Sequence, residues 1–375
     1  MLIQYIFLLL LVLLAISVGD ITRRRGFNNL RIYRKVVNNR IIEGEEFQIT
    51  TIVENNKRLP LFFLAIAEQI PNGLSYTTEV ISYKEGKDTW HISKYAVKWF
   101  ERKKRIYTLR GDKRGTYLIK NVNVTVGDIF GFSADTRESE DFIEVLVYPK
   151  IHSISKYEFD ITNFQGQDAV KRWIHKDPLF IKGIREYNVE DRMKDIHWKS
   201  SLKMNKLMVK DYDYTSEREL VIILNVQCAD PHWSNIQPEA IEAGVKISAS
   251  LAAKALKEGI PTGLWTNSQL ISFETNILNE IKPAMNNMKN IMEVCARIDV
   301  SVKSEFNEYL HLQYGKLDLN CTYIIVSPYL NEKDINIISK MRRSGYRVKL
   351  IDVSLKANLP SVEGIEKITY IGGGL

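Results

Sequence analysis

The sequence is poor in cysteine, which excludes the small domains that depend on disulfide bonds. Its 375 residues contain three cysteines, Cys228, Cys295 and Cys321. An odd number at this spacing fits neither a disulfide framework nor a metal site, and it agrees with a cytoplasmic location. We therefore predict that the three thiols are free and buried, as free cysteines usually are.

The sequence also lacks the motifs that hold nucleotides and metal ions. Gly372, Gly373 and Gly374 lie at the carboxyl end, and no helix follows them to face a phosphate group. Five of the histidines are scattered and lack the spacing of metal ligands: His91, His152, His175, His232 and His311. We expect no cofactor to bind.

Positive charge is absent before Arg23 and concentrated directly after it. The run from Leu2 to Gly19 is uncharged, and a bilayer core needs about 20 apolar residues of helix, with roughly 17 as the minimum. We therefore predict a transmembrane anchor over residues 1–22. After Asp20, seven basic residues precede the next acidic residue, Glu43: Arg23, Arg24, Arg25, Arg31, Arg34, Lys35 and Arg40. This asymmetry predicts a single-pass protein of the cell membrane whose body is cytoplasmic.

A cleaved signal peptide is the main alternative to an anchor. Ser17, Val18 and Gly19 resemble a cleavage site, but a signal peptide begins with positive charge, and this sequence does not. The alternative would place the body outside the cell, where an adhesion domain would be expected.

The basic flank also explains the charge of the whole chain. Its seven positive charges equal the net charge of +7, so the remainder is close to neutral. A nucleic-acid-binding protein is therefore not indicated, and the predicted partner of the basic flank is the membrane surface.

Residues 23–150 have the pattern of a β-sandwich-like domain. Phe47 to Val53 is rich in β-branched residues, and Val122 to Val126 alternates strictly between apolar and polar residues. Turn signals such as Pro71-Asn72-Gly73 separate these short strands.

Residues 217–375 have the pattern of a doubly wound α/β domain, in which strands alternate with helices. Strands are predicted at 220–224, 263–266, 322–326, 347–353 and 367–371, and helices at 238–258, 279–297, 301–313 and 332–343. Residues 151–216 form a connecting segment with one predicted helix from Asp191 to Leu202. The predicted fold class is thus α+β and multidomain.

The connecting segment contains the most distinctive stretch of the sequence, from Gly183 to Trp198. Seven of its residues combine both charge signs with aromatic rings: Arg185, Glu186, Tyr187, Asp191, Lys194, His197 and Trp198. The stretch resembles the signature of the family called domain of unknown function fifty-eight. In that signature Arg-Glu-Tyr is followed by Gly-Asp, a basic residue and Ile-Asp-Trp. Lys194 stands where arginine is usual, while Glu190 and His197 replace the usual glycine and aspartate.

Further stretches of the β region look like landmarks of the same family. They are Arg114-Gly115-Thr116-Tyr117, the segment from Asp128 to Gly131, and Tyr148-Pro149. The resemblance implies that the α/β domain is similar to von Willebrand factor type A domains. It also implies a non-catalytic partner of a MoxR-type AAA+ ATPase.

A type A domain that binds Mg²⁺ places Asp-x-Ser-x-Ser after its first strand. The matching positions in this sequence are Asn225, Gln227 and Ala229, so the carboxylate and both hydroxyl groups are missing. Neutral oxygens alone hold Mg²⁺ poorly, and we therefore expect a degenerate site without metal. Asp230 is the nearest residue that could substitute.

The seven signature residues admit a catalytic and a structural interpretation. His197 could act as a general base, but no nucleophile paired with a base accompanies it. We favour ion pairs and partner docking, with Trp198 packed beneath them. The predicted function is that of a membrane-anchored, non-enzymatic scaffold, and a cell-envelope enzyme that uses the Arg185–Trp198 stretch is the alternative.

Overall fold

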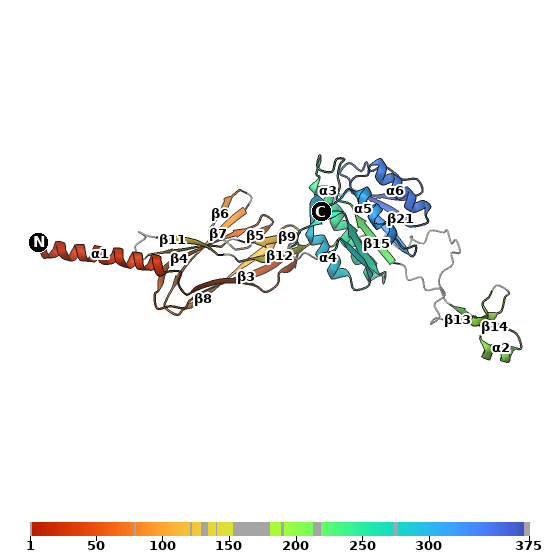
Figure 1. Cartoon of the computed structure of the whole chain (residues 1–375), viewed down its shortest axis with the longest axis horizontal. Coiled ribbons are helices and arrows are strands. Elements are labelled where there is room, and N and C mark those ends of the chain that lie inside the picture. Colours follow the sequence, from red (N-terminus) through yellow and green to blue (C-terminus); the bar gives the residue numbers. More distant parts are fainter. Residues whose placement is uncertain are drawn as a thin grey trace.

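The structure, a computed structural model, is an elongated chain of distinct parts (Figure 1). Helix α1 leads into a β domain, an α/β domain follows, and a small hairpin unit lies at the opposite end from α1. The structure describes residues 2–78, 80–86, 88–120, 122–128, 134–139, 141–152, 181–188, 191–212, 219–272 and 277–370.

Helix α1 (Leu2–Arg25) corrects the prediction for the amino-terminal segment. Among the residues that the structure describes, no helix combines the length and the apolar character needed to cross a bilayer. The uncharged run that ends at Gly19 gives about 27 Å of helix at 1.5 Å per residue, less than the roughly 30 Å of a hydrocarbon core. The helix also continues into a charged turn, in which Arg24 pairs with Asp20 at 2.8 Å. The predicted anchor over residues 1–22, and the single-pass membrane localisation that rested on it, are therefore wrong.

The β domain contains three sheets of short strands, mostly antiparallel. The first sheet has the order β1 (Leu30–Val36), β3 (Glu46–Asn55), β8 (Arg102–Gly111), β5 (Leu74–Tyr76). The second has the order β11 (Ala134–Ser139), β10 (Val122–Gly127), β4 (Leu61–Ile70), β7 (Asp88–Val97), β6 (Ser82–Glu85). The third has the order β2 (Arg40–Ile42), β12 (Ile143–Tyr148), β9 (Gly115–Ile119). The predicted alternation over Val122–Val126 is confirmed, because the valines are buried between half-buried polar residues.

The α/β domain is built on a six-stranded sheet that is parallel apart from one edge strand. Its order is β18 (Glu280–Ala284), β16 (Thr262–Thr266), β15 (Glu219–Leu224), β20 (Cys321–Ser327), β21 (Arg347–Asp352), β22 (Glu366–Thr369). A two-stranded ribbon of β17 (Ser268–Leu270) and β19 (Ile298–Val302) lies beside it. The chain leaves β15 toward β16 and later returns to β20, so the direction of winding reverses between β15 and β20.

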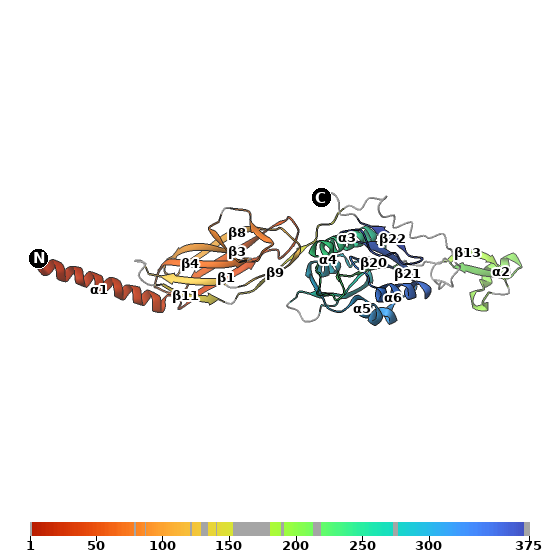
Figure 2. The same cartoon turned by 90° about the horizontal axis from the view of Figure 1, so that it is seen from above.

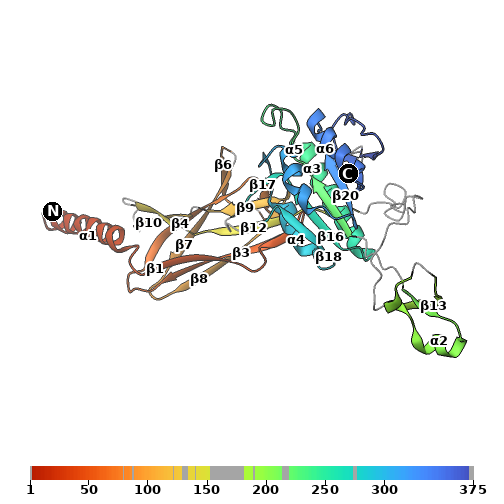
Figure 3. The same cartoon turned by 45° about the vertical axis from the view of Figure 1, so that its right-hand side comes forward.

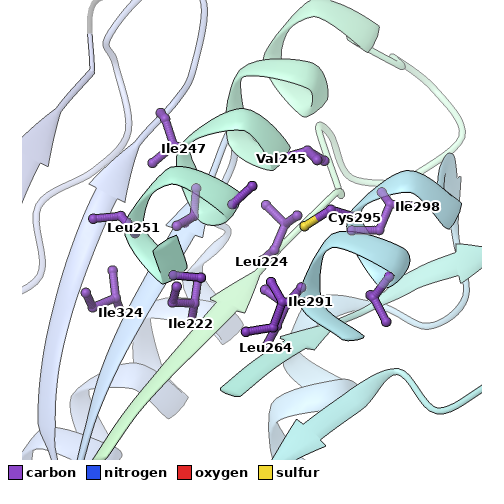
Figure 4. Close-up of a cluster of buried hydrophobic side chains, with 14 of the residues drawn as sticks. Ile222, Leu224, Val245, Ile247, Leu251, Leu264, Ile291, Cys295, Ile298 and Ile324 are labelled. Carbon is purple, nitrogen blue, oxygen red and sulfur yellow. The ribbon is translucent and has the colours of Figure 1, made fainter. Parts of the chain in front are cut away.

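Helices cover both faces of this sheet (Figure 2). One apolar core joins the sheet to α3 (Pro238–Lys257) and α4 (Met288–Arg297), and Figure 4 shows Ile222 and Leu224 facing Val245 and Cys295 there. The other core joins the sheet to α5 (Phe306–Gln313), its 3₁₀ extension η3 (Tyr314–Lys316) and α6 (Glu332–Arg343). The three cysteines are free and buried, as predicted.

Two predicted helices of this domain are too long in the sequence interpretation. Residues 280–284 form the edge strand β18, and α4 begins only at Met288. Pro283 cannot donate a hydrogen bond to a helix, but an edge strand tolerates it. Residues 301 and 302 likewise belong to β19, and α5 begins at Phe306.

Buried arginines tie the β domain to the α/β domain. The Arg114 guanidinium, on the loop between β8 and β9, pairs with Glu242 of α3 at 2.7 Å. In the opposite direction, Arg297 at the end of α4 pairs with Glu144 of β12. Both arginine side chains are at most 3% exposed, so the two domains pack closely at this boundary.

The hairpin unit, residues 181–212, contains β13 (Ile181–Glu186), η2 (Met193–Asp195), α2 (Trp198–Met204) and β14 (Met208–Tyr212). The predicted helix from Asp191 to Leu202 is therefore wrong over its first half, where a 3₁₀ turn replaces it. Other parts of the predicted connecting segment, residues 153–180, 189–190 and 213–218, lie outside the described residues. The hairpin unit lies apart from the sheet in all three views (Figure 3).

Candidate functional site

The first candidate site lies where the winding of the α/β sheet reverses. In doubly wound sheets, ligands bind outside the carboxyl ends of the strands at this point. Asn225 directly follows β15, and Ser327 ends the neighbouring strand β20. The fold thus places Asn225 and Ser327 side by side at the carboxyl edge of the sheet.

Asn225 is completely buried, and its side-chain amide is satisfied by other parts of the chain. Its Nδ2 donates to Ser327 Oγ at 2.9 Å and to the Tyr329 carbonyl oxygen at 3.1 Å. Its Oδ1 accepts from Asn267 Nδ2 at 3.0 Å and from the Gln227 amide at 2.9 Å. A carbonyl oxygen has two lone pairs, so neither remains available to an ion.

Gln227 is also completely buried and points into the domain. Its Oε1 accepts from the Phe306 amide at 2.9 Å, and its Nε2 donates to the Ala229 carbonyl oxygen at 3.0 Å. The Phe306 amide is an unsatisfied donor at the start of α5, so Gln227 completes that helix end. Ala229 contributes only its carbonyl oxygen to this network.

These positions do not fit a magnesium ion. Among the described residues, no group of three or more His, Cys, Asp or Glu side chains is placed to hold a metal. Asp230, the potential substitute, is exposed and accepts a hydrogen bond from Asn331 Nδ2 at 3.3 Å. The amides at this edge join β15 to the loops after β16 and β20, and they use the oxygens that an ion would need.

Asp334 is a buried carboxyl group beside this network that sequence reasoning missed. Burial raises the pKa of Asp334 to about 6, and the charges of Asp230 and Glu305 add to this increase. The main-chain amide of Asn331 opposes it by donating to Asp334 Oδ2 at 2.9 Å. Asn331 returns the contact as the N-cap of α6, because its Oδ1 accepts from the Asp334 amide. The spacing Asn-x-x-Asp before an apolar helix was the available signal.

An apolar loop lies between β15 and α3, beside the same edge of the sheet. Trp233 is 69% exposed and Ile236 is 47% exposed, although both are large apolar side chains. The His232 ring packs edge-on against the Trp233 ring, with centroids 4.8 Å apart. This loop was not singled out in the sequence analysis. The sequence feature that could have indicated it is a tryptophan, Trp233, in a short segment between Pro231 and Pro238.

The second candidate site is the signature stretch in the hairpin unit. Arg185 at the end of β13 donates from both terminal nitrogens to the two carboxylate oxygens of Asp191, at 2.7 and 2.5 Å. Asp191 also accepts from the Asn188 amide at 2.8 Å. The Asp191 side chain is 8% exposed and the Arg185 side chain is 44% exposed. This bidentate pair closes the turn that follows β13.

The remaining signature residues are structural or exposed. His197 is the N-cap of α2, and its Nδ1 accepts from the Ser200 amide at 3.2 Å, which uses the lone pair that a general base needs. The Tyr187 amide donates to the Leu207 carbonyl oxygen, and Glu186 pairs with Lys206 at the surface. Lys194 is exposed. Trp198 is 62% exposed, so the prediction that it is packed beneath the ion pairs is wrong.

The two candidate sites are separate surfaces of the molecule. The partners of Arg185, Glu186 and His197 described above belong to the hairpin unit, whereas Asn225 and Gln227 lie inside the α/β domain. Figure 1 shows the hairpin unit apart from the strand ends of the sheet.

A protein-family model matches the part of the chain that contains both candidate sites. The family described as "Protein of unknown function DUF58" matches residues 183–362, which include the hairpin unit and most of the α/β domain. The uncharacterized protein YeaD of Bacillus subtilis (strain 168) is 21% identical over 299 residues. The aligned region covers 78% of this chain and 69% of YeaD.

Solved structures give only weak likenesses. The CARDB domain of the PF1109 protein from Pyrococcus furiosus has a TM-score of 0.21 and 12% identity, covering 32% of this chain and 94% of that one. A cohesin module from a Clostridium perfringens family 33 glycoside hydrolase has a TM-score of 0.24 and 14% identity. It covers 32% of this chain and 98% of its own. TM-scores this low support no inference about function.

Proposed function

We propose that this chain is a non-enzymatic interaction protein whose α/β domain binds a protein partner beside the carboxyl ends of β15 and β20. The observation that carries the proposal is the combination of saturated amides and exposed apolar side chains at one edge. The side-chain amides of Asn225 and Gln227 are hydrogen-bonded within the chain, whereas Trp233 and Ile236 are exposed nearby. Exposed aromatic anchors are typical of protein interfaces.

The resemblance to the domain of unknown function fifty-eight family narrows this proposal. It implies that the α/β domain is a degenerate relative of von Willebrand factor type A domains and that the partner is a MoxR-type AAA+ ATPase. The six-stranded sheet with helices on both faces is compatible with that fold. Recognition would then proceed without a bridging metal ion.

The alternative of an enzyme centred on Arg185–Trp198 gains no support from the hairpin unit. Arg185 is held by Asp191, and the His197 lone pair is used by a main-chain amide. Neither arrangement resembles a base poised to activate a nucleophile.

Binding of the purified chain to a purified MoxR-type ATPase from the same organism tests the proposal. Isothermal titration should show that the wild-type chain binds the ATPase. W233A and I236A should each raise the dissociation constant by about tenfold or more. The control is W99A, because Trp99 is 63% exposed on the β domain. Equal losses for W99A and W233A, or no binding of the ATPase by the wild-type chain, would contradict the proposal.

A further inference from the structure

In the hairpin unit, more of the described large apolar side chains are exposed than buried. Among the side chains of this unit that the structure describes, the buried apolar ones are Ile196, Met208 and Val209, which are 5%, 8% and 0% exposed. Six other large apolar side chains are between 42% and 84% exposed: Ile184, Met193, Trp198, Leu202, Met204 and Leu207. Exposed apolar side chains gathered on so small a unit mark an interaction surface.

Helix α2 gives this surface its geometry. Ser201 faces the hairpin, because its Oγ accepts from the Met208 amide at 2.9 Å. Trp198 and Leu202 are four residues apart and therefore share one side of the helix. They are 62% and 84% exposed, so an apolar pair runs along α2.

The charge beside this pair is positive. Lys199 and Lys203 also lie four residues apart on α2, and both are exposed. Arg192 is exposed on the preceding turn as well, and among the described residues none of these three forms an ion pair. The acidic residues nearby are engaged, since Asp191 is bound to Arg185 and Glu186 to Lys206. Among the side chains of the hairpin unit that the structure describes, the exposed charge left for a partner is therefore basic.

We infer that this hairpin surface, formed by Trp198, Lys199, Leu202 and Lys203, docks a segment of another protein that carries apolar side chains flanked by carboxylates. Apolar burial would supply affinity, and the lysines would select carboxylates and speed the encounter. Pairing of two copies of this chain through the same surface is disfavoured, because each copy presents the same positive charges. A nucleic acid is disfavoured because five of the six exposed apolar side chains are aliphatic and cannot stack on bases.

The surface extends the proposed function but does not depend on it. The two surfaces lie on different parts of the chain, so W233A and I236A should leave hairpin docking unchanged. A wild-type chain that fails to bind the ATPase would therefore refute the proposed function without affecting this inference. Failure of the hairpin surface to bind its peptide would likewise leave the proposed function untouched.

The probe for the test is a fluorescent helical peptide with leucine on one face and glutamate on the other, titrated with the full chain. Anisotropy should show binding that weakens about tenfold when salt rises from about 50 to about 300 mM, because screening removes the charge attraction. A peptide with lysine in place of every glutamate should not bind.

Variants assign the binding to the surface. K199E/K203E and W198A/L202A should each weaken binding at least about tenfold. The matched control K104E/K113E reverses two exposed lysines of the β domain and should bind as the wild type does. Circular dichroism should show that all variants remain folded, since the four hairpin side chains are exposed or half-exposed.

Four results would overturn the inference. They are equal binding of the glutamate and lysine peptides, no loss in K199E/K203E, concentration-dependent self-association that W198A/L202A removes, and binding of single-stranded DNA or anionic vesicles in place of the glutamate peptide.

Discussion

The Arg114 guanidinium of the β domain donates to the Cys295 carbonyl oxygen of α4, in the α/β domain, at 2.7 Å. The same nitrogen donates to the Ile298 carbonyl oxygen at 3.0 Å, and the Arg114 Nε pairs with Glu242. A buried cation thus lies at the carboxyl end of α4, where free carbonyl groups and the helix dipole favour positive charge. This contact explains a stretch, Arg114 to Tyr117, that the sequence marked only by resemblance.

We expect R114A to destabilise the chain by about 3 kcal/mol, because two buried carbonyl groups and one carboxylate lose their partner. Urea unfolding measures the change. The control is R110A, whose side chain is 52% exposed and pairs with Asp112 on the same loop. That variant should change the free energy of unfolding by less than about 0.5 kcal/mol. A loss as large in R110A as in R114A would show that the buried contact is not responsible.

We expect N225D to destabilise the α/β domain by about 2 to 4 kcal/mol, without creating a magnesium site. The substitution removes Asn225 Nδ2, which donates hydrogen bonds to Ser327 Oγ and to the Tyr329 carbonyl oxygen. It also buries the negative charge of a carboxylate. Thermal unfolding with and without MgCl₂ tests both parts. A stabilisation by Mg²⁺ that the wild type lacks would contradict our account of the degenerate site.

The contribution of Asp334 to the stability of the chain should fall as the pH rises from about 4 to about 6, because burial raises the pKa of this carboxyl group. The pKa of Asp334 is about 6 in the folded chain, whereas the ordinary pKa of an aspartate side chain is 3.8. Between these two values, the folded state holds a proton that the unfolded state has lost. The free energy of unfolding therefore decreases with pH, by about 3 kcal/mol in total for this group.

D334N should remove this contribution, so between pH 4 and pH 6 the slope of the free energy of unfolding against pH should be more positive than in the wild type. An asparagine oxygen can still accept from the Asn331 amide, so the helix cap is retained. D135N, at a partly exposed position on β11, serves as the control and should keep the wild-type slope. An unchanged slope in D334N would mean that another group titrates in this range.

R185A should open the turn of the hairpin unit locally while leaving the rest of the chain intact. The variant leaves Asp191, whose side chain is 8% exposed, without its bidentate partner, at a cost of roughly 1 to 2 kcal/mol. Hydrogen exchange of the Tyr187 amide, which bonds to the Leu207 carbonyl oxygen, should accelerate about tenfold. K206A removes only an exposed pair with Glu186 and should leave that exchange rate nearly unchanged.

Some elements of this chain follow from local sequence alone. The apolar run at Leu220–Leu224 became β15, and Glu332–Arg343 became α6 with the predicted bounds. In these segments propensity, periodicity and capping residues agree with one another. The absence of carboxylates at Asn225, Gln227 and Ala229 is likewise a fact of the sequence, and so is the basic excess after Arg23.

The tertiary structure decided the rest. Nothing near Arg114 in the sequence points to Cys295, because that contact depends on how two domains pack. The amide of Asn225 finds Asn267 and Ser327 only after the sheet has assembled. Its residue type predicts that Trp198 is buried in a core, but the ring is exposed, because the hairpin on which α2 packs is too small to cover it. Local patterns therefore determined the elements, whereas long-range packing determined which polar groups are satisfied and which apolar side chains remain exposed.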